Sequence, residues 1–171
     1  MSMQQIDIDE KIVIKELQHN SNEGIEKIAN RCRFSRQKVW RIIKKLEKNN
    51  TIWGYHAIID SEKLNQKRYI VLVKKTNRPI GKLLETILSR EIEKNAADIG
   101  VSIQSSLYLH GSFDWFLLFT AENIKQAKKF CEQFNSIYQN YVNEIELIEE
   151  IFPVKRCGIQ NPNIDKLREF V

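Results

Sequence analysis

The chain has 171 residues, a net charge of +5 and 42% hydrophobic residues, so it can bury one medium core or two small ones. It has no run of about 18 apolar residues and no signal-peptide pattern, which predicts no membrane span and a cytoplasmic location. The three cysteines and three histidines are scattered, so neither a disulfide framework nor a metal site is expected.

The positive charge is concentrated in one short stretch. Residues 31–48 hold eight basic residues and one acidic residue, whereas residues 56–171 hold 16 basic and 15 acidic residues. A basic focus on an otherwise balanced chain indicates a polyanionic partner, if the local structure places the charges on one face.

Residues 1–60 are predicted to begin with two helices. Asp9 is the expected N-cap of a first helix that runs to about Asn20. The apolar face of this helix is expected to contain Ile8, Ile12, Val13 and Leu17. The second helix is shorter, and its apolar side contains Ile25, Ile28, Ala29 and Cys32.

A third helix is predicted from about Arg36 to Lys48, with Ser35 as its N-cap. Its apolar stripe consists of Val39, Ile42, Ile43 and Leu46. The opposite face carries long polar side chains, which suit a major groove because Arg and Gln bond base edges and Lys contacts phosphates. The candidate DNA-binding residues are Ser35, Arg36, Gln37, Lys38, Arg41, Lys44, Lys45 and Lys48.

Residues 51–60 are rich in aromatic and branched residues and are expected to form a strand, with Gly54 at a bulge. The three helices and this exit resemble the Lrp/AsnC (feast/famine) regulators. The matching stretches are Ile8-Asp9, Leu17-Gln18, Phe34-Ser35, residues 44–47 and Ile52-Trp53-Gly54-Tyr55. Arg33 stands where the family often has a glycine, so it has to avoid a left-handed conformation or accept its cost.

Residues 61–68 are polar and predict a linker. Residues 69–157 predict the order strand, helix, strand, strand, helix, strand, which is that of a ferredoxin-like βαββαβ plait. The expected strands cover residues 69–75, 101–109, 113–120 and 144–155, and the expected helices cover residues 80–97 and 122–141. The apolar residues of 101–109 alternate and are expected on one face, and residues 113–120 are expected to form a central strand. Residues 158–171 form a tail with a short helix from Ile164.

The predicted fold class is therefore α+β, with an N-terminal winged helix-turn-helix and a C-terminal plait. Residues 109–117 resemble a turn motif of the same family, with His110 where threonine is usual. In that family small effectors, typically amino acids, bind near this turn at contacts between dimers. The resemblance implies that His110, Gly111, Ser112 and Asp114 are candidate effector-binding residues. The same residues also fit a well-capped hairpin, in which Gly111 permits the turn and Asp114 accepts backbone N–H bonds.

By resemblance the chain is a transcriptional regulator and not an enzyme. Its partners would be double-stranded DNA, a small effector such as an amino acid, and further copies of itself in a homodimer or higher oligomer. Two alternatives stay open: an enzyme like the sirohaem decarboxylases, which resemble both domains, and an interaction module that has lost DNA binding. Against the enzyme, the sequence offers no nucleophile–base pair, carboxylate pair or phosphate-cradling loop, so no catalytic residue or cofactor is predicted.

Overall fold

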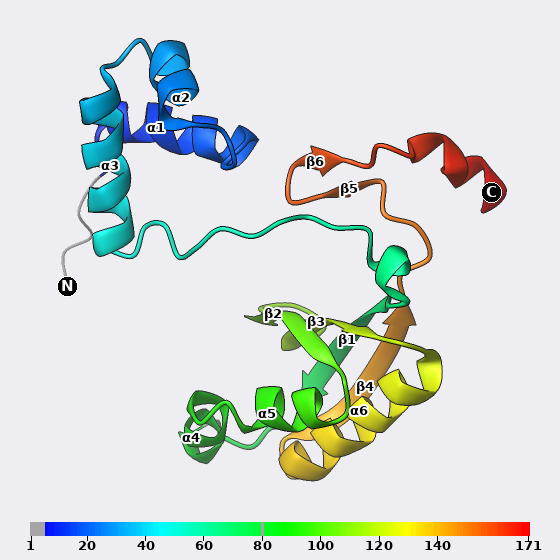
Figure 1. The fold of residues 1–171 in the computed structure, drawn as a ribbon. Coiled ribbons are helices and arrows are strands. Elements are labelled where there is room, and N and C mark those ends of the chain that lie inside the picture. Colours follow the sequence, from blue (N-terminus) through cyan, green and yellow to red (C-terminus); the bar gives the residue numbers. More distant parts are fainter. Residues whose placement is uncertain (1–5, 80) are drawn as a thin grey trace. The chain divides into compact units, whose positions relative to one another are not determined.

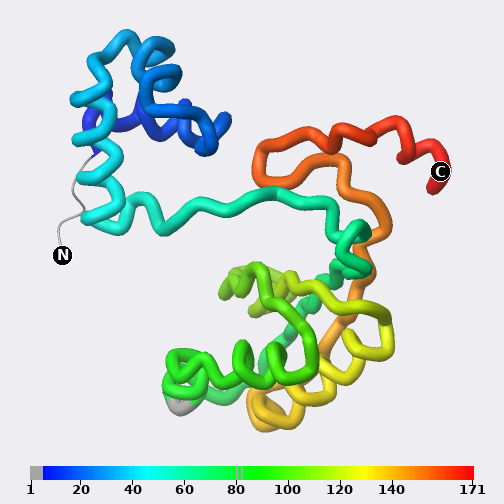
Figure 2. Tube along the Cα trace, in the orientation of Figure 1, coloured from blue at the N-terminus to red at the C-terminus, as the bar shows by residue number. Residues whose placement is uncertain are grey.

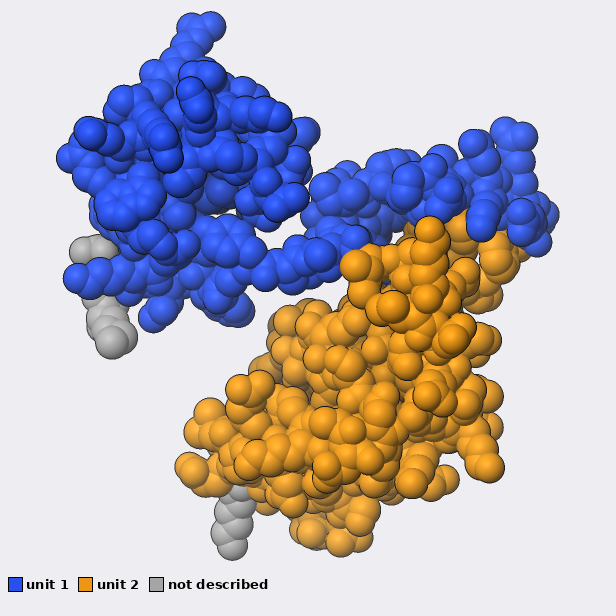
Figure 3. All heavy atoms as spheres, viewed as in Figure 1, with its two compact units in different colours: residues 1–58, 154–169, 171 blue, residues 59–153, 170 orange. Residues whose placement is uncertain are grey.

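The computed structural model describes residues 6–79 and 81–171. The chain divides into two compact units (Figure 3). The first unit comprises residues 1–58 with 154–169 and 171, and the second comprises residues 59–153 with 170. Within the described residues, no helix is both long and apolar enough to cross a bilayer. The same residues contain no group of three side chains suited to hold a metal ion.

The first unit begins with a helical head, residues 6–50, that contains α1 (Ile8–His19), α2 (Ile25–Cys32) and α3 (Arg36–Lys48) (Figure 1). The three predicted helices are thus confirmed. Their shared core consists of Val13, Ile28, Ala29, Cys32, Val39 and Ile43. Because each helix contributes one apolar stripe to this small core, the opposite stripe of each helix faces solvent.

The first helix starts differently from the prediction. Asp7, not Asp9, is the N-cap: its carboxylate accepts from the Glu10 N–H at 2.8 Å, and the Glu10 carboxylate accepts from the Asp7 N–H at 3.1 Å. This capping box satisfies two free backbone donors of the first turn. Ile8 is 77% exposed, because it lies about 140° around the helix from the buried Val13.

The strand predicted for residues 51–60 is wrong. The segment 53–60 has no strand partner among the described residues, and the Trp53 side chain is 95% exposed. A strand needs a neighbouring strand to bond its N–H and C=O groups, and no described strand pairs with this segment. Near the C-terminus, β5 (Lys155–Arg156) and β6 (Ile159–Gln160) form a short hairpin, and the predicted helix from Ile164 is a 3-10 helix, η2 (Ile164–Glu169).

The second unit has the predicted order of elements. After a 3-10 turn, η1 (Ser61–Leu64), come β1 (Lys67–Lys75), α4 (Gly81–Leu88), α5 (Glu91–Asp98), β2 (Ser102–Tyr108), β3 (Trp115–Ala121), α6 (Ile124–Tyr138) and β4 (Val142–Glu149). The sheet order is β2-β3-β1-β4, and every neighbouring pair is antiparallel. The chain path can be followed in Figure 2. The expected central position of β3 is confirmed.

One face of the sheet packs against α5 and α6. The core there includes Tyr69, Val71, Leu117, Phe119, Phe130 and Phe134, all at most 1% exposed. Phe119 and Phe130 lie with their ring centroids 4.6 Å apart, as do Phe134 and Tyr138. Phe130 of α6 is therefore a main contributor to the core, whereas Ile124 at the start of α6 is 42% exposed.

Two local features depart from the predicted plait. The single helix expected over residues 80–97 is broken into α4 and α5, and residue 80 lies outside the described residues. The break occurs because the Ser89 hydroxyl donates to the Thr86 carbonyl at 2.8 Å and Arg90 takes a left-handed conformation with φ 56°. In β2 a bulge between Ile103 and Ser105 changes which face of the sheet the following side chains lie on. Ile103 packs on the core, but Leu107 is 51% exposed on the other face.

Candidate nucleic-acid interface and effector turn

The α3 helix presents a polar face to solvent. The Ser35 hydroxyl accepts from the Lys38 N–H at 3.2 Å, which confirms Ser35 as the cap. Val39 and Leu46 are completely buried, so the rotation of the helix about its axis is fixed. The opposite face exposes Gln37, Arg41, Lys44 and Lys48. This face combines planar donors, which can bond base edges, with ammonium groups, which can contact phosphates.

Several cations of the basic stretch are already paired with carboxylates. Lys38 Nζ lies 2.5 Å from Asp9 of α1, and Lys45 Nζ forms an ion pair with Glu10 of α1. Lys44 pairs with Glu47 in its own helix at 2.7 Å. The hydrogen bond to Glu10 raises the pKa of Lys45, and the hydrogen bond from Lys44 lowers the pKa of Glu47. The two ion pairs with α1 were not predicted, since they depend on how α1 packs beside α3.

Other cations have no such partner. Among residues 6–79 and 81–171, no ion pair engages Arg36, Arg41 or Lys48. All three are exposed, as is Gln37. The structure therefore divides the cations among the candidate residues into two groups. Arg36, Arg41 and Lys48 form no ion pair with a described residue, whereas the charge of Lys38, Lys44 and Lys45 is balanced locally.

The sequence left open whether Arg33, in the turn between α2 and α3, avoids the left-handed conformation or adopts it despite its unfavourable energy; the structure shows that it adopts it. Arg33 is left-handed, with φ 57° and ψ 38°. Its N–H donates to the Asn30 carbonyl at 3.2 Å, and the Phe34 N–H donates to the Ala29 carbonyl at 3.0 Å. These bonds close the end of α2 and direct the chain into the Ser35 cap.

The candidate effector residues lie at the connection between β2 and β3. His110, Gly111 and Ser112 are exposed. Gly111 does not have a positive φ, and a Cβ there would meet nothing within 4 Å, so the turn does not require glycine. This corrects the interpretation of Gly111 as the residue that permits the turn.

Asp114 is held by β1. Its carboxylate accepts from the Lys75 N–H at 2.9 Å, and its own N–H donates to the Val73 carbonyl at 2.9 Å. The Asp114 carbonyl accepts from the Leu109 N–H at 2.7 Å, which closes the hairpin. Asp114 therefore bonds backbone donors as predicted, but its side chain ties the turn to the neighbouring strand. That role is structural whether or not an effector binds.

Two hollows adjoin these regions. An apolar cavity of about 40 Å³ is lined by Leu83, Tyr108, Asp114, Trp115 and Tyr138, among others. It is far smaller than the roughly 300–1,000 Å³ of typical ligand sites. Burial raises the pKa of Tyr138 to about 12, so this phenol stays protonated.

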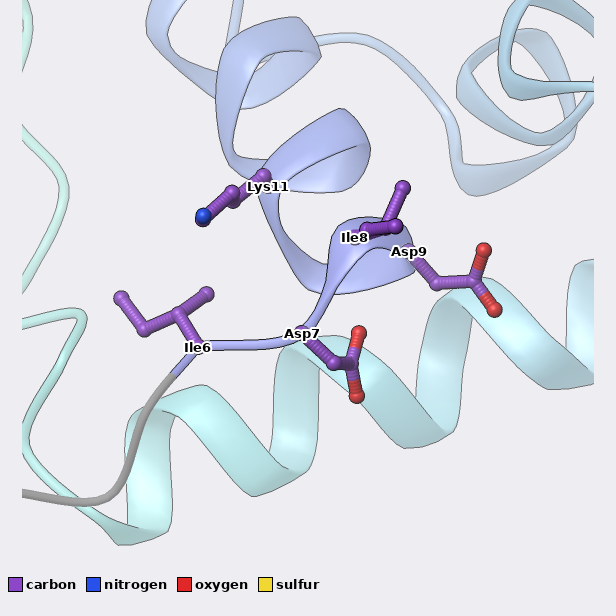
Figure 4. A pocket seen from close by; sticks show the side chains of 5 residues that line it. All are labelled: Ile6, Asp7, Ile8, Asp9 and Lys11. Atoms are coloured by element: carbon purple, nitrogen blue, oxygen red, sulfur yellow. The ribbon is translucent and has the colours of Figure 1, made fainter.

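The second hollow is an open depression at the start of α1, lined by Ile6, Asp7, Ile8, Asp9 and Lys11 (Figure 4). Asp7 is engaged as the helix cap and Asp9 by Lys38. The hollow therefore carries no free carboxylate of its own.

Solved structures resemble about nine-tenths of the chain. No known family model and no curated protein sequence matches it. An AsnC family transcriptional regulator from Agrobacterium tumefaciens is 18% identical with a TM-score of 0.65, over 88% of this chain and 93% of that one. The leucine response regulatory protein of Mycobacterium tuberculosis is 15% identical with a TM-score of 0.68, over 91% and 99%.

The chain has the Lrp/AsnC fold. A transcriptional regulator from Neisseria meningitidis, solved in complex with L-Met, also shares this fold, at 16% identity and a TM-score of 0.66, over 89% of this chain and 94% of that one. The Lrp/AsnC fold joins a helix-turn-helix to a ferredoxin-like plait. The predicted fold class and the resemblance seen in the sequence are confirmed at this level.

Proposed function

We propose that this chain is a sequence-specific DNA-binding transcriptional regulator of the Lrp/AsnC type that acts in the cytoplasm. Its DNA-binding domain is residues 1–60, followed by a linker, 61–68, an effector and oligomerisation domain, 69–157, and a tail, 158–171. One observation carries the proposal: α3 exposes Gln37, Arg41, Lys44 and Lys48 on the face opposite its buried stripe. The regulators that share the fold support it.

In this proposal α3 enters the major groove. Gln37 and Arg41 bond base edges, because their planar donors match base acceptors. Ser35, Arg36, Lys44 and Lys48 contact the phosphate backbone, which sets the register of the helix. Lys38, Lys44 and Lys45 contribute less, since ion pairs with α1 or within α3 already compensate their charge.

The test uses duplexes enriched by this protein from genomic DNA, followed by gel shift. Arg41→Ala is expected to weaken specific binding by about 1–3 kcal/mol. Lys128→Ala removes a positive charge that is also exposed, on α6 of the second unit, and serves as the control, with no expected loss. If Arg41→Ala and Gln37→Ala both bind the enriched duplex like the wild type, α3 is not the recognition helix.

Self-association is the second part of the proposal. The sheet face opposite α5 and α6 carries an open apolar patch, defined here as Ile70, Leu72, Leu107, Phe116, Leu118 and Ile148. These side chains are half-buried or exposed, and register places Leu72 beside Phe116 and Ile70 beside Leu118. An apolar patch of this kind favours burial against a second copy. A dimer would also supply two α3 helices for a two-fold DNA site.

The third part concerns a small effector, such as an amino acid, near His110, Gly111, Ser112 and Asp114. The fold relative solved with L-Met supports an amino-acid effector. Calorimetric titration with a panel of amino acids is the test, and His110→Ala should abolish the heat while leaving the unfolding midpoint unchanged, because His110 is exposed. Asp114 is a poor test residue since its substitution also removes the bond to Lys75. Absence of heat with every amino acid would refute this part alone.

A further inference from the structure

We infer that Asp9 limits the electrostatic affinity of the helical head for DNA: its carboxylate, paired with Lys38, keeps that ammonium from a phosphate. This inference rests on the proposed function and adds to it a residue on α1, outside the recognition helix. Without α1, the recognition helix would present Lys38 to phosphates. The pairing with Asp9 removes this ammonium from the set of available cations.

Asp9 is not needed to start its own helix. The capping box is made by Asp7 and Glu10. The Asp9 side chain is 43% exposed, and its contact is the ammonium of Lys38 at 2.5 Å. The Asp9 carboxylate therefore pairs with a cation of α3 and does not cap α1.

Lys38 remains near the same place without Asp9. Its Nζ lies 3.9 Å from the centroid of the Phe34 ring, a cation–π geometry that holds the ammonium at the N-terminal end of α3. Lys38 directly follows Gln37 of the exposed face, so its ammonium flanks the proposed groove-facing stripe. Loss of the Asp9 charge would leave this ammonium uncompensated and available to a phosphate.

Glu10 provides the contrast. It reaches Lys45, two turns further along the same flank of α3, but its side chain is only 4% exposed and also accepts from the Asp7 N–H. Removing its charge would disturb the capping box and the packing of α1 on α3. Glu10 is therefore a positioning residue, and Asp9 is the member of the pair whose effect is electrostatic.

The physical consequence is electrostatic. Non-cognate binding is carried by phosphate contacts, and cognate binding adds base contacts that Asp9 does not touch. Each phosphate contact adds roughly 0.9 to the slope of log affinity against log salt. Asp9 thus lowers the affinity for any duplex by withholding one phosphate contact, and it makes binding less dependent on salt.

The experiment compares the wild type, Asp9→Asn, Lys38→Gln and the double variant by fluorescence anisotropy across a salt series, with a random duplex and with the enriched duplex. Asp9→Asn is expected to bind the random duplex several-fold more tightly at low salt, with a slope steeper by about 0.9. The double variant should match Lys38→Gln, because the gain acts through Lys38. Glu26→Gln, which removes an exposed charge from α2, is the matched control.

The outcomes separate the two claims. If the wild type binds DNA but Asp9→Asn leaves both slope and affinity unchanged, the inference is overturned while the proposed function stands. An equal gain in Glu26→Gln also overturns it, since net charge alone would then explain the effect. A wild type that binds no duplex at any salt overturns the proposed function and, with it, the inference. An unchanged unfolding midpoint in Asp9→Asn confirms that the variant is folded.

Discussion

The three thiols of the chain differ in how readily a reagent in solvent reaches them. Cys157 is exposed at the tip of the β5–β6 hairpin, Cys131 is half-buried on α6, and Cys32 is buried in the helical head. Burial raises the pKa of the Cys131 thiol to about 11 and raises the pKa of the Cys32 thiol as well. Since the thiolate is the reactive form and both thiols are shielded from solvent, both should react slowly at neutral pH.

Alkylation with iodoacetamide at neutral pH should therefore label Cys157 first, and Cys131 and Cys32 only slowly. The pKa of Cys131 is higher in the folded state than the ordinary value of about 8.5. Burial of the protonated Cys131 thiol therefore contributes its full stabilisation below about pH 8.5. This stabilisation is lost as the pH rises toward about 11, the pKa of the folded state. Mass spectrometry of peptides checks the order, and denatured protein, in which the difference should vanish, is the control. Equal labelling of all three in the folded protein would contradict it.

For single residues, the sequence predicted the role that a side chain takes better than it predicted which residues that side chain contacts. Ser35 was identified as a cap because the residue type and the following helix suffice for that inference. Asp9 was mistaken for a cap, since Asp7 and Asp9 are both good N-cap residues and only the backbone shows where the helix begins. The ion pairs of Lys38 and Lys45 were missed because each partner lies on another helix.

Among the elements, the turn from α2 to α3 contains a residue in an unfavourable backbone conformation, and a substitution there can stabilise the fold. Arg33 holds a left-handed conformation that is unfavourable for a residue with a Cβ. Arg33→Gly is expected to stabilise the chain against unfolding by up to about 1 kcal/mol, because glycine is preferred at this position of a helix end. Thermal unfolding of Arg33→Gly against Arg33→Ala measures this. The alanine variant also loses the charge but keeps the Cβ, so a gain of the same size in it would contradict the explanation.

Element order was predictable because each helix and each buried strand repeats its apolar residues at its own period. The breaks within elements were not predictable from these periods. The division of α4 from α5 depends on Ser89 and Arg90, and the bulge in β2 depends on how Gln104 is accommodated beside β3. The strand predicted for residues 51–60 did not form for a related reason: its composition is right, but pairing requires a second strand.

For the whole molecule, the open apolar patch leads to a prediction about mass in solution. Leu107 and Ile148 lie on strands at the two edges of the sheet, and they are 51% and 36% exposed. The double variant Leu107→Lys with Ile148→Lys should therefore fold but disfavour self-association, because each copy would place two charges in the contact. Light scattering after size exclusion should show a monomer where the wild type shows a dimer or larger.

Leu84→Lys is the control for this prediction, since Leu84 is 48% exposed on α4 rather than on the sheet. It should leave the assembly unchanged. If the double variant keeps the mass of the wild type, the patch is not the contact. A fall in affinity for a two-fold operator, together with the loss of assembly, would follow from the loss of the second recognition helix.

The three tryptophans are distributed so that each gives a separate optical signal. Trp40 is 50% exposed on α3, Trp53 is 95% exposed, and Trp115 packs against Phe134 and Tyr138 with its Nε1 donating to Ser106 at 2.9 Å. Replacing Trp40 and Trp53 by phenylalanine would leave an indole whose emission reports melting of the plait alone. Keeping Trp40 instead would leave an indole beside the proposed recognition face, where bound DNA should quench its emission. Ligand and DNA titrations can then be followed by tryptophan fluorescence without any added dye.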